Sequence, residues 1–87
     1  MQNLKILRQQ IDVLDKELLL IISKRLKIVG QIGILKRQLK LAALQPKRWQ
    51  EVIDSRVKSA EKLKLDVNFT KKIFNLIHEE ALKIENK

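Results

Sequence analysis

Hydrophobic residues between positions 4 and 39 recur at alternating spacings of four and three residues. The positions on this repeat are Leu4, Arg8, Ile11, Asp15, Leu18, Ile22, Arg25, Val29, Ile32, Lys36 and Leu39, flanked by a heptad of Leu7, Leu14, Ile21, Ile28 and Leu35. Such spacing places both sets along one side of a helix that packs against other helices. The pattern predicts one very long helix, on the order of 55 Å at a rise of ~1.5 Å per residue.

Two shorter helices are predicted after a connection at residues 41–45. Pro46 suits the first turn of a helix, where its missing N–H costs nothing, and Asp66 or Asn68 can cap a third helix. The three predicted helices span about residues 3–40, 46–63 and 67–85. No segment shows the alternation of a β-strand, so we expect an all-α, three-helix chain that forms a single domain over residues 1–87.

The predicted first helix exposes more apolar surface than two short helices can cover. We therefore expect an intertwined helical homodimer, in which the long helices pair and the shorter ones fold over them. In an antiparallel pair, Asp15 is expected to neutralise a cation of the other chain, which is a structural role. Gly30 and Gly33 lie inside the long helix, where they are expected to permit close approach of another helix or a ligand.

Four charged residues occupy positions of the repeat where leucine or isoleucine is expected: Arg8, Asp15, Arg25 and Lys36. Burying an unpaired charge is costly, so these residues need partners if they face the bundle. Three of the four are cations, which favours an anionic ligand bound inside the bundle. For each cation taken alone, exposure of its long side chain to solvent is the alternative.

Candidates on the other two helices point to the same site. Arg25 and Lys36 are eleven residues apart, about three turns, and therefore project in nearly the same direction. Arg48 lies in the first turn of the second helix, and Glu85 lies on one face of the third, although either residue alone is more typical of an exposed surface. Several cations and one carboxylate suit a compact dicarboxylate. The sequence lacks the glycine-rich phosphate loop, activated nucleophile and paired carboxylates of common hydrolytic sites.

The net charge of +9 invites a nucleic-acid or membrane partner, but its distribution argues against both. The lysines are scattered over several turns and only three residues are aromatic, unlike a dense nucleic-acid-binding surface. The chain has no cysteine and one histidine, which excludes thiolate and multi-histidine metal sites. It has neither a signal-peptide pattern nor an apolar run long enough to cross a bilayer, so a cytoplasmic location is expected.

An ordered set of residues extends over essentially the whole chain. Its members are Leu7-Arg8, Ile11-Asp12, Leu14-Asp15, Lys24-Arg25, Val29-Gly30, Lys36, Pro46, Arg48, Leu65-Asp66, Ile73-Phe74 and Glu79. This set closely resembles the all-helical chorismate mutase family. The resemblance implies an intertwined dimer of three-helix chains that rearranges chorismate to prephenate, with no metal and no cofactor.

The resemblance also implies roles for individual residues. Arg8 would bind a substrate carboxylate in the partner subunit's site, Arg25 would bind a carboxylate within its own chain, and Arg48 would add positive potential. Lys36 would donate a hydrogen bond to the ether oxygen, where negative charge grows in the transition state. Glu85 matches a position that is Gln or Glu in the family and contacts the same oxygen, for which it must be protonated. Activity is therefore expected to decline as the pH rises.

Three positions depart from the family's pattern. Gln45 stands where the family often has Asp, Trp49 where a Glu commonly binds the ring hydroxyl, and Ala81 where a Ser assists the ring carboxylate. We expect Gln45 to bind the hydroxyl through its amide, Trp49 to cover the cavity mouth as a core residue, and substrate binding to be weaker. Residues 45–49 are also similar to mutase domains fused to DAHP synthase, which makes such a synthase a candidate partner.

Other functions remain alternatives at this stage. Isochorismate pyruvate lyase uses the same fold and similar cations, and would act on isochorismate instead of chorismate. A regulatory module that senses chorismate or prephenate would bind its ligand without turnover. A basic helical dimer that binds nucleic acid would lose affinity steeply with salt, and it is disfavoured because its key cations would be buried.

Overall fold

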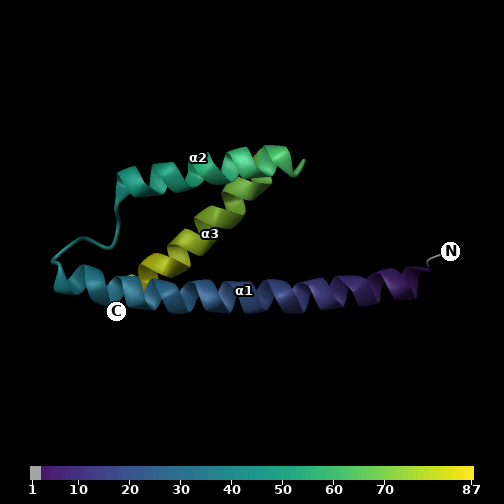
Figure 1. Ribbon diagram of the computed structural model, residues 1–87, viewed down its shortest axis with the longest axis horizontal. Coiled ribbons are helices and arrows are strands. Elements are labelled where there is room, and N and C mark those ends of the chain that lie inside the picture. The colour runs from purple at the N-terminus through teal and green to yellow at the C-terminus, as the bar shows by residue number, and fades with distance from the viewer. Residues whose placement is uncertain (1–2) are drawn as a thin grey trace.

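The computed structural model describes residues 3–87, which form three α-helices and no strand (Figure 1). The helices are α1 (Leu4–Gln38), α2 (Pro46–Lys62) and α3 (Val67–Glu85). The predicted all-α class, the helix order and the very long first helix are confirmed, and each predicted end lies within two residues of the observed one. None of the helices in this part of the chain is long and apolar enough to cross a membrane.

Polar side chains fix where α1 and α3 begin. The Asn3 side-chain oxygen accepts a hydrogen bond from the Ile6 N–H at 2.9 Å, and the Asp66 carboxylate accepts one from the Phe69 N–H at 2.7 Å. Each side chain thereby satisfies one of the free N–H groups of a first turn. Of the two predicted caps for α3, Asp66 is the one used. Helix α2 begins with Pro46, as predicted, and has no side-chain cap.

Helices α1 and α2 end in the same way. Lys40 and Lys64 adopt positive φ angles of 57° and 58°. The following residues, Leu41 and Leu65, donate backbone hydrogen bonds of 2.8 Å to carbonyl groups five residues earlier. This arrangement satisfies the last carbonyls and reverses the chain direction, and it usually carries glycine at the left-handed position. The two sharp ends allow α2 and α3 to fold back along the C-terminal half of α1.

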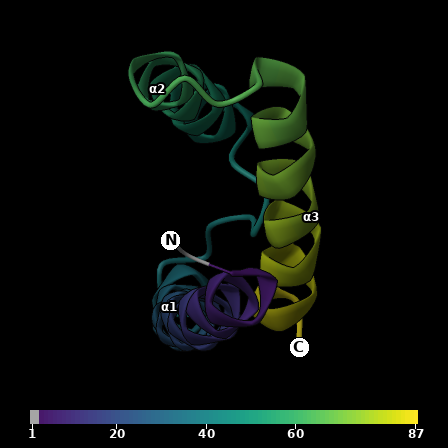
Figure 2. The ribbon, with the colours of Figure 1, turned by 90° about the vertical axis from the view of Figure 1, so that its right-hand side faces the viewer.

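Helix α3 connects the other two helices. It packs against α1 near its own C-terminus and against α2 near its N-terminus, whereas α1 and α2 make no close backbone contact with each other. Figure 2, viewed along α1, shows α3 as a bridge between them with an open side. The result is an elongated chain measuring 58 × 24 × 15 Å.

The buried core is small, and its closest contact involves a glycine. Its apolar residues are Val29, Val52, Ala60 and Ala81. A Cβ on Gly33 would lie 3.0 Å from the Cα of Glu85, so the absence of a side chain there lets α1 and α3 meet. The predicted close approach is confirmed at Gly33. At Gly30 nothing of the described chain lies within 4 Å of a Cβ built there, so close approach of a ligand or of a second chain stays a prediction.

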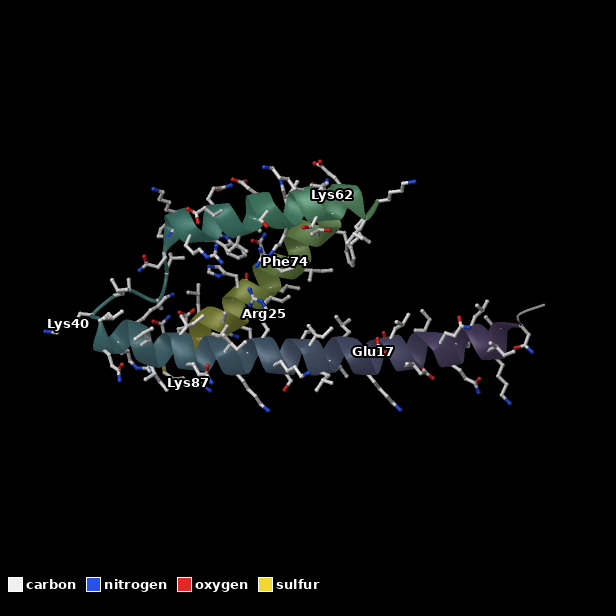
Figure 3. All side chains as sticks on the ribbon, in the orientation of Figure 1. Glu17, Arg25, Lys40, Lys62, Phe74 and Lys87 are labelled. Carbon is white, nitrogen blue, oxygen red and sulfur yellow. The ribbon has the colours of Figure 1, made fainter. Side chains whose placement is uncertain are left out.

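The N-terminal half of α1 has no neighbouring helix. Residues 3–21 are all exposed, including Leu14, Leu18 and Ile21 at more than half of their surface. Figure 3 shows their side chains standing free on both sides of the helix. The chain exposes 7456 Å², whereas compact monomers of its mass expose about 5,300 Å². The excess is comparable to the area that one chain buries in a large obligate interface.

Candidate active site

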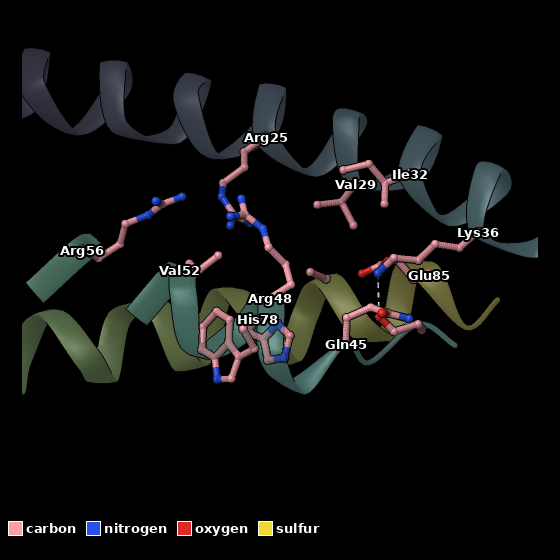
Figure 4. Close-up of a pocket in the computed structure, with 13 residues that line it drawn as sticks. Arg25, Val29, Ile32, Lys36, Gln45, Arg48, Val52, Arg56, His78 and Glu85 are labelled. Atoms are coloured by element: carbon pink, nitrogen blue, oxygen red, sulfur yellow. Dashed lines mark hydrogen bonds and ion pairs between the residues drawn. The ribbon is translucent and has the colours of Figure 1, made fainter. Parts of the chain in front are cut away.

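The C-terminal half of α1, the connection to α2, and the inner faces of α2 and α3 enclose a pocket of about 240 Å³ (Figure 4). Its lining residues are Arg25, Val29, Ile32, Lys36, Ala43, Gln45, Arg48, Trp49, Val52, Arg56, His78, Ala81 and Glu85. Four of them are cationic and one is a carboxylate. Six of the seven site residues predicted from the sequence therefore lie together, and the seventh is Arg8.

Arg8 lies outside this pocket. It is an exposed residue on the free N-terminal half of α1, about one turn after the start of the helix. The pocket lies instead against residues of the C-terminal half, from Arg25 onward. Within one chain Arg8 and Lys36 are separated by 28 residues of continuous helix, on the order of 40 Å. Only a second chain could bring an Arg8 to this pocket.

Lys36 and Glu85 form an ion pair at one end of the pocket. The Lys36 Nζ lies 2.6 Å from Glu85 Oε1 and also donates to the Ala43 carbonyl oxygen at 2.6 Å. The Glu85 side chain is only 7% exposed, so the two charges lie in a region of weak solvent screening. The sequence hypothesis that Glu85 faces the same cavity as Lys36 is confirmed.

The backbone around Glu85 explains why its side chain is held there. Gly33 allows α3 to approach α1 at this residue, and the Arg37 guanidinium donates to the Glu85 carbonyl oxygen at 2.8 Å. That bond satisfies a carbonyl of the last helical turn, which has no partner inside the helix. Two residues of α1, Gly33 and Arg37, thus fix the C-terminal turn of α3 beside Lys36.

Arg25 lies at the other end of the pocket. One guanidinium nitrogen, Nη1, is buried and has no hydrogen-bond partner among the described residues. Burial and, to a smaller extent, the nearby Arg56 cation lower the pKa of Arg25 from its ordinary value. A guanidinium stays charged even so. This end of the pocket therefore holds an unneutralised charge with a free donor, which is suited to a carboxylate ligand.

Arg48 and Gln45 border the pocket from the start of α2. The Arg48 side chain is 67% exposed and lies 3.8 Å from Glu51, an exposed pair that contributes little to stability. The Gln45 amide donates to the Ala42 carbonyl oxygen at 2.9 Å, which leaves its own carbonyl oxygen free to accept. Ala81 is buried and contributes only apolar surface.

Three charged or aromatic residues of the pocket were not assigned a contact with ligand from the sequence. Arg56 and Trp49 come from α2, and His78 comes from α3. The indole of Trp49 stacks on the imidazole of His78, with ring centroids 3.8 Å apart and an interplanar angle of 7°. Trp49 lines the pocket, as expected of a residue at the cavity mouth, but it is half-buried and not part of the buried core. Helical spacing contains the missing signal, since Arg56 follows Arg48 by eight residues and His78 precedes Glu85 by seven.

His78 is held as a neutral group. Burial is the main cause that lowers its pKa, and the Arg25 and Lys36 cations add to it, although the Glu85 and Glu79 carboxylates oppose the shift. Its Nε2 atom is covered and has no hydrogen-bond partner among residues 3–87. No group of three His, Asp or Glu side chains in this part of the chain is arranged to bind a metal ion.

Comparison with known proteins places this chain in a family. Residues 7–86 match the family model described as chorismate mutase type II. The T-protein of Haemophilus influenzae is 34% identical over 86 residues, which cover 99% of this chain and 23% of that protein. The T-protein of Enterobacter agglomerans is 34% identical over 84 residues, covering 97% and 22%. The chain thus spans less than a quarter of the length of these relatives.

Proposed function

This chain belongs to the chorismate mutase type II family, and from that premise we propose that it converts chorismate to prephenate. The observation that carries the proposal is the charge pattern of the pocket. A half-buried lysine pairs with a buried glutamate at one end, and the other end holds Arg25 and Arg56, which pair with no carboxylate of the described residues, with apolar walls between the two ends. A small dianion with a breaking ether bond fits such a pattern.

For this reaction the enzyme must hold the substrate in a reactive conformation and stabilise the charge that develops in the transition state. One C–O bond breaks while a C–C bond forms within the same molecule, and no proton, electron or leaving group is exchanged. Holding the flexible substrate in a compact conformation lowers the entropic barrier. Donors aimed at the ether oxygen stabilise the negative charge that develops there. In this proposal Lys36 is the main donor, because its ammonium group lies inside the pocket and is fixed by Ala43 and Glu85.

Glu85 is proposed as the second donor to the ether oxygen. In the ligand-free pocket its Oε1 atom forms an ion pair with the Lys36 ammonium at 2.6 Å, and a carboxylate can only accept hydrogen bonds. To donate to the substrate, Glu85 must take up a proton when the dianion binds. Binding and catalysis are then coupled to proton uptake, so activity declines as the pH rises.

The carboxylates of the substrate are proposed to bind at the arginine end. Arg25 has a buried donor without a partner, and Arg48 lines the same end of the pocket. We propose that Arg8 of a second chain completes this end of the site in a homodimer. The free N-terminal half of α1 and its large exposed area support this assembly. The free carbonyl oxygen of Gln45 is the proposed acceptor for the ring hydroxyl, and Ala81 forms part of the apolar wall.

The test is to follow chorismate consumption by absorbance and identify the product, comparing the wild-type chain with Lys36→Ala. Removing one charge-stabilising donor is expected to reduce kcat on the order of 10²- to 10³-fold. Lys72→Ala is the matched control, because Lys72 is an exposed lysine of α3 that does not line the pocket. Formation of prephenate that requires Lys36 but not Lys72 would support the proposal.

Two negative results would select the alternatives. Turnover of isochorismate with none of chorismate would identify a pyruvate lyase. Binding of chorismate without turnover of either compound would identify a sensing module. The cytoplasmic location and a DAHP synthase partner stay predictions, to be checked by fractionation and by co-purification.

A further inference from the structure

Arg56 is the cation of the pocket that the family pattern did not supply. It is half-buried in the middle of α2 and lines the same cavity as Arg25. No carboxylate among residues 3–87 lies within 4 Å of either guanidinium, since the ion pairs of the described chain are Lys36–Glu85, Arg48–Glu51 and Lys83–Glu80. Two arginines therefore share one pocket end without an acidic partner.

Two contacts orient Arg56 without neutralising it. Its guanidinium carbon lies 5.7 Å from the centre of the Phe74 ring, a cation–π distance, and its Nη1 donates to the Ser55 hydroxyl at 3.2 Å. Cation–π contact holds a guanidinium in place while leaving most of its N–H donors available. Figure 4 shows Arg25 entering the pocket from α1 and Arg48 rising opposite it, with Arg56 to one side and its end directed toward Arg25.

Like charges in one cavity are unfavourable in the absence of an anion. Their mutual effect is visible in Arg25, whose pKa is lowered by burial and additionally by Arg56. An arginine with a purely structural role would be expected to pair with a carboxylate or to extend into solvent. Arg56 pairs with no carboxylate of the described residues and is half-buried against the pocket, and the buried Nη1 of Arg25 also lacks a partner there. A carboxylate placed between the two groups would satisfy both.

We propose that Arg56 is a further substrate-binding residue, which together with Arg25 binds one carboxylate of the dianionic substrate from within a single chain. The inference rests on the proposed function, because it assigns the substrate of that site. A pair of guanidinium groups offers a carboxylate several charge-assisted hydrogen bonds in a fixed plane. Arg56 would thus compensate in part for the ring-binding groups that Trp49 and Ala81 do not provide.

The test compares Arg56→Leu, Arg56→Lys and the wild-type chain in steady-state kinetics and in calorimetric titrations with chorismate. Arg56→Leu is expected to raise KM and Kd by about tenfold or more, with a smaller change in kcat, and Arg56→Lys to recover part of the loss. Lys62→Leu is the matched control, because it removes the same charge from an exposed position near the end of α2.

Melting temperatures distinguish a binding role from a structural one. Removing Arg56 relieves its repulsion with Arg25, so Arg56→Leu is expected to keep or raise the melting temperature of the ligand-free chain. Weaker binding at an unchanged melting temperature supports the proposal. Unchanged KM and Kd in a folded Arg56→Leu chain overturn it, as does full weakening in Lys62→Leu.

A double substitution tests whether both arginines hold one carboxylate. If they do, Arg25→Lys combined with Arg56→Leu will weaken binding by less than the product of the single effects. Strict multiplicativity contradicts a shared carboxylate. The proposed function can fail separately: binding that depends on Arg56 without prephenate formation keeps the anion site and rejects the mutase, whereas a wild-type chain that binds no chorismate rejects both.

Discussion

The two halves of α1 carry the same hydrophobic repeat but lie in opposite environments. From Arg25 to Gln38, the helix contributes to a pocket whose other walls come from the same chain. From Leu4 to Ile21, every residue is exposed and no other helix among residues 3–87 lies alongside. The repeat therefore specifies which face of the helix is to be covered, but not which chain covers it.

The charged residues on the repeat differ in the same way. Arg25 and Lys36 replace apolar residues in the C-terminal half, and both face the pocket with neighbours from α3 or the connection to α2. Arg8 and Asp15 replace apolar residues in the N-terminal half, and both are exposed in the single chain. If the proposed homodimer forms, one half of α1 supplies its own site and the other half supplies the partner's site.

The largest expected effect comes from substituting one charged residue in each half of α1 and placing the two substitutions on different chains of the proposed homodimer. Arg8→Ala and Lys36→Ala homodimers are each expected to lose on the order of 10²-fold or more in kcat/KM, because each lacks one charge of every site. Mixing the two variants after mild denaturation and refolding generates heterodimers in which one of the two sites is intact. Activity should then recover to about a quarter of the wild-type level, as random pairing of two-fold dimers requires.

A matched mixture makes this result specific. Arg25→Ala and Lys36→Ala both damage the half of α1 that serves its own chain's pocket, so every site in their heterodimer lacks one group. That mixture should stay inactive. Mass-tagged subunits verify that the chains exchange. If activity then recovers in both mixtures or in neither, Arg8 does not complete the site of the partner chain.

A smaller effect is expected from Glu85→Gln, which acts only within one chain's pocket. The amide donates a hydrogen bond at every pH, whereas the carboxylate must first be protonated. The wild-type kcat/KM should fall roughly tenfold per pH unit on the alkaline limb, and the Glu85→Gln profile should stay flat there. Profiles measured between pH 5 and 9 check this, and a Glu85→Gln profile that parallels the wild type would show that Glu85 is not the proton-dependent donor.

The contrast between the halves also explains what the sequence could predict. Asn3, Pro46 and Asp66 mark helix starts through local chemistry, so the helix boundaries were predicted closely. Lys36 and Glu85 were predicted to share a cavity because their positions on two helical faces are set by period alone. Their 2.6 Å contact depends in addition on Gly33, which brings the two backbones together.

The environments of some pocket residues were not predicted, because they depend on packing between helices, which the helical period alone does not describe. Trp49 was expected to be a core residue that covers the cavity mouth. It does line the pocket, but it is only half-buried, because α1 and α2 do not meet, and it stacks on His78 of α3. Arg56 was not singled out from the sequence, and its orientation depends on the Phe74 ring of α3, 5.7 Å away. Such pairs require the crossing geometry of two helices, which a single helical repeat does not contain.

The smallest expected effect concerns protonation of His78, a property of the pocket half that should be independent of the partner chain. The folded state lowers the pKa of His78, mainly through burial. The unfolded chain therefore binds more protons as the pH falls through about 6.5, so stability is complete above that value and declines below it. Because the ring is partly exposed and screened by water, the loss should stay below about 1 kcal/mol. Urea unfolding between pH 7.5 and 5.0 should show a shallower decline for His78→Gln than for wild type.

Trp49 is the single tryptophan, and no tyrosine is present, so the fluorescence of Trp49 reports on the stacked imidazole directly. Quenching with an apparent midpoint below pH 6.5, retained in Arg8→Ala and absent in His78→Gln, is the expected signature. A midpoint above 6.5 would mean that Glu85 and Glu79 outweigh burial, and that the pocket holds an additional cation at neutral pH.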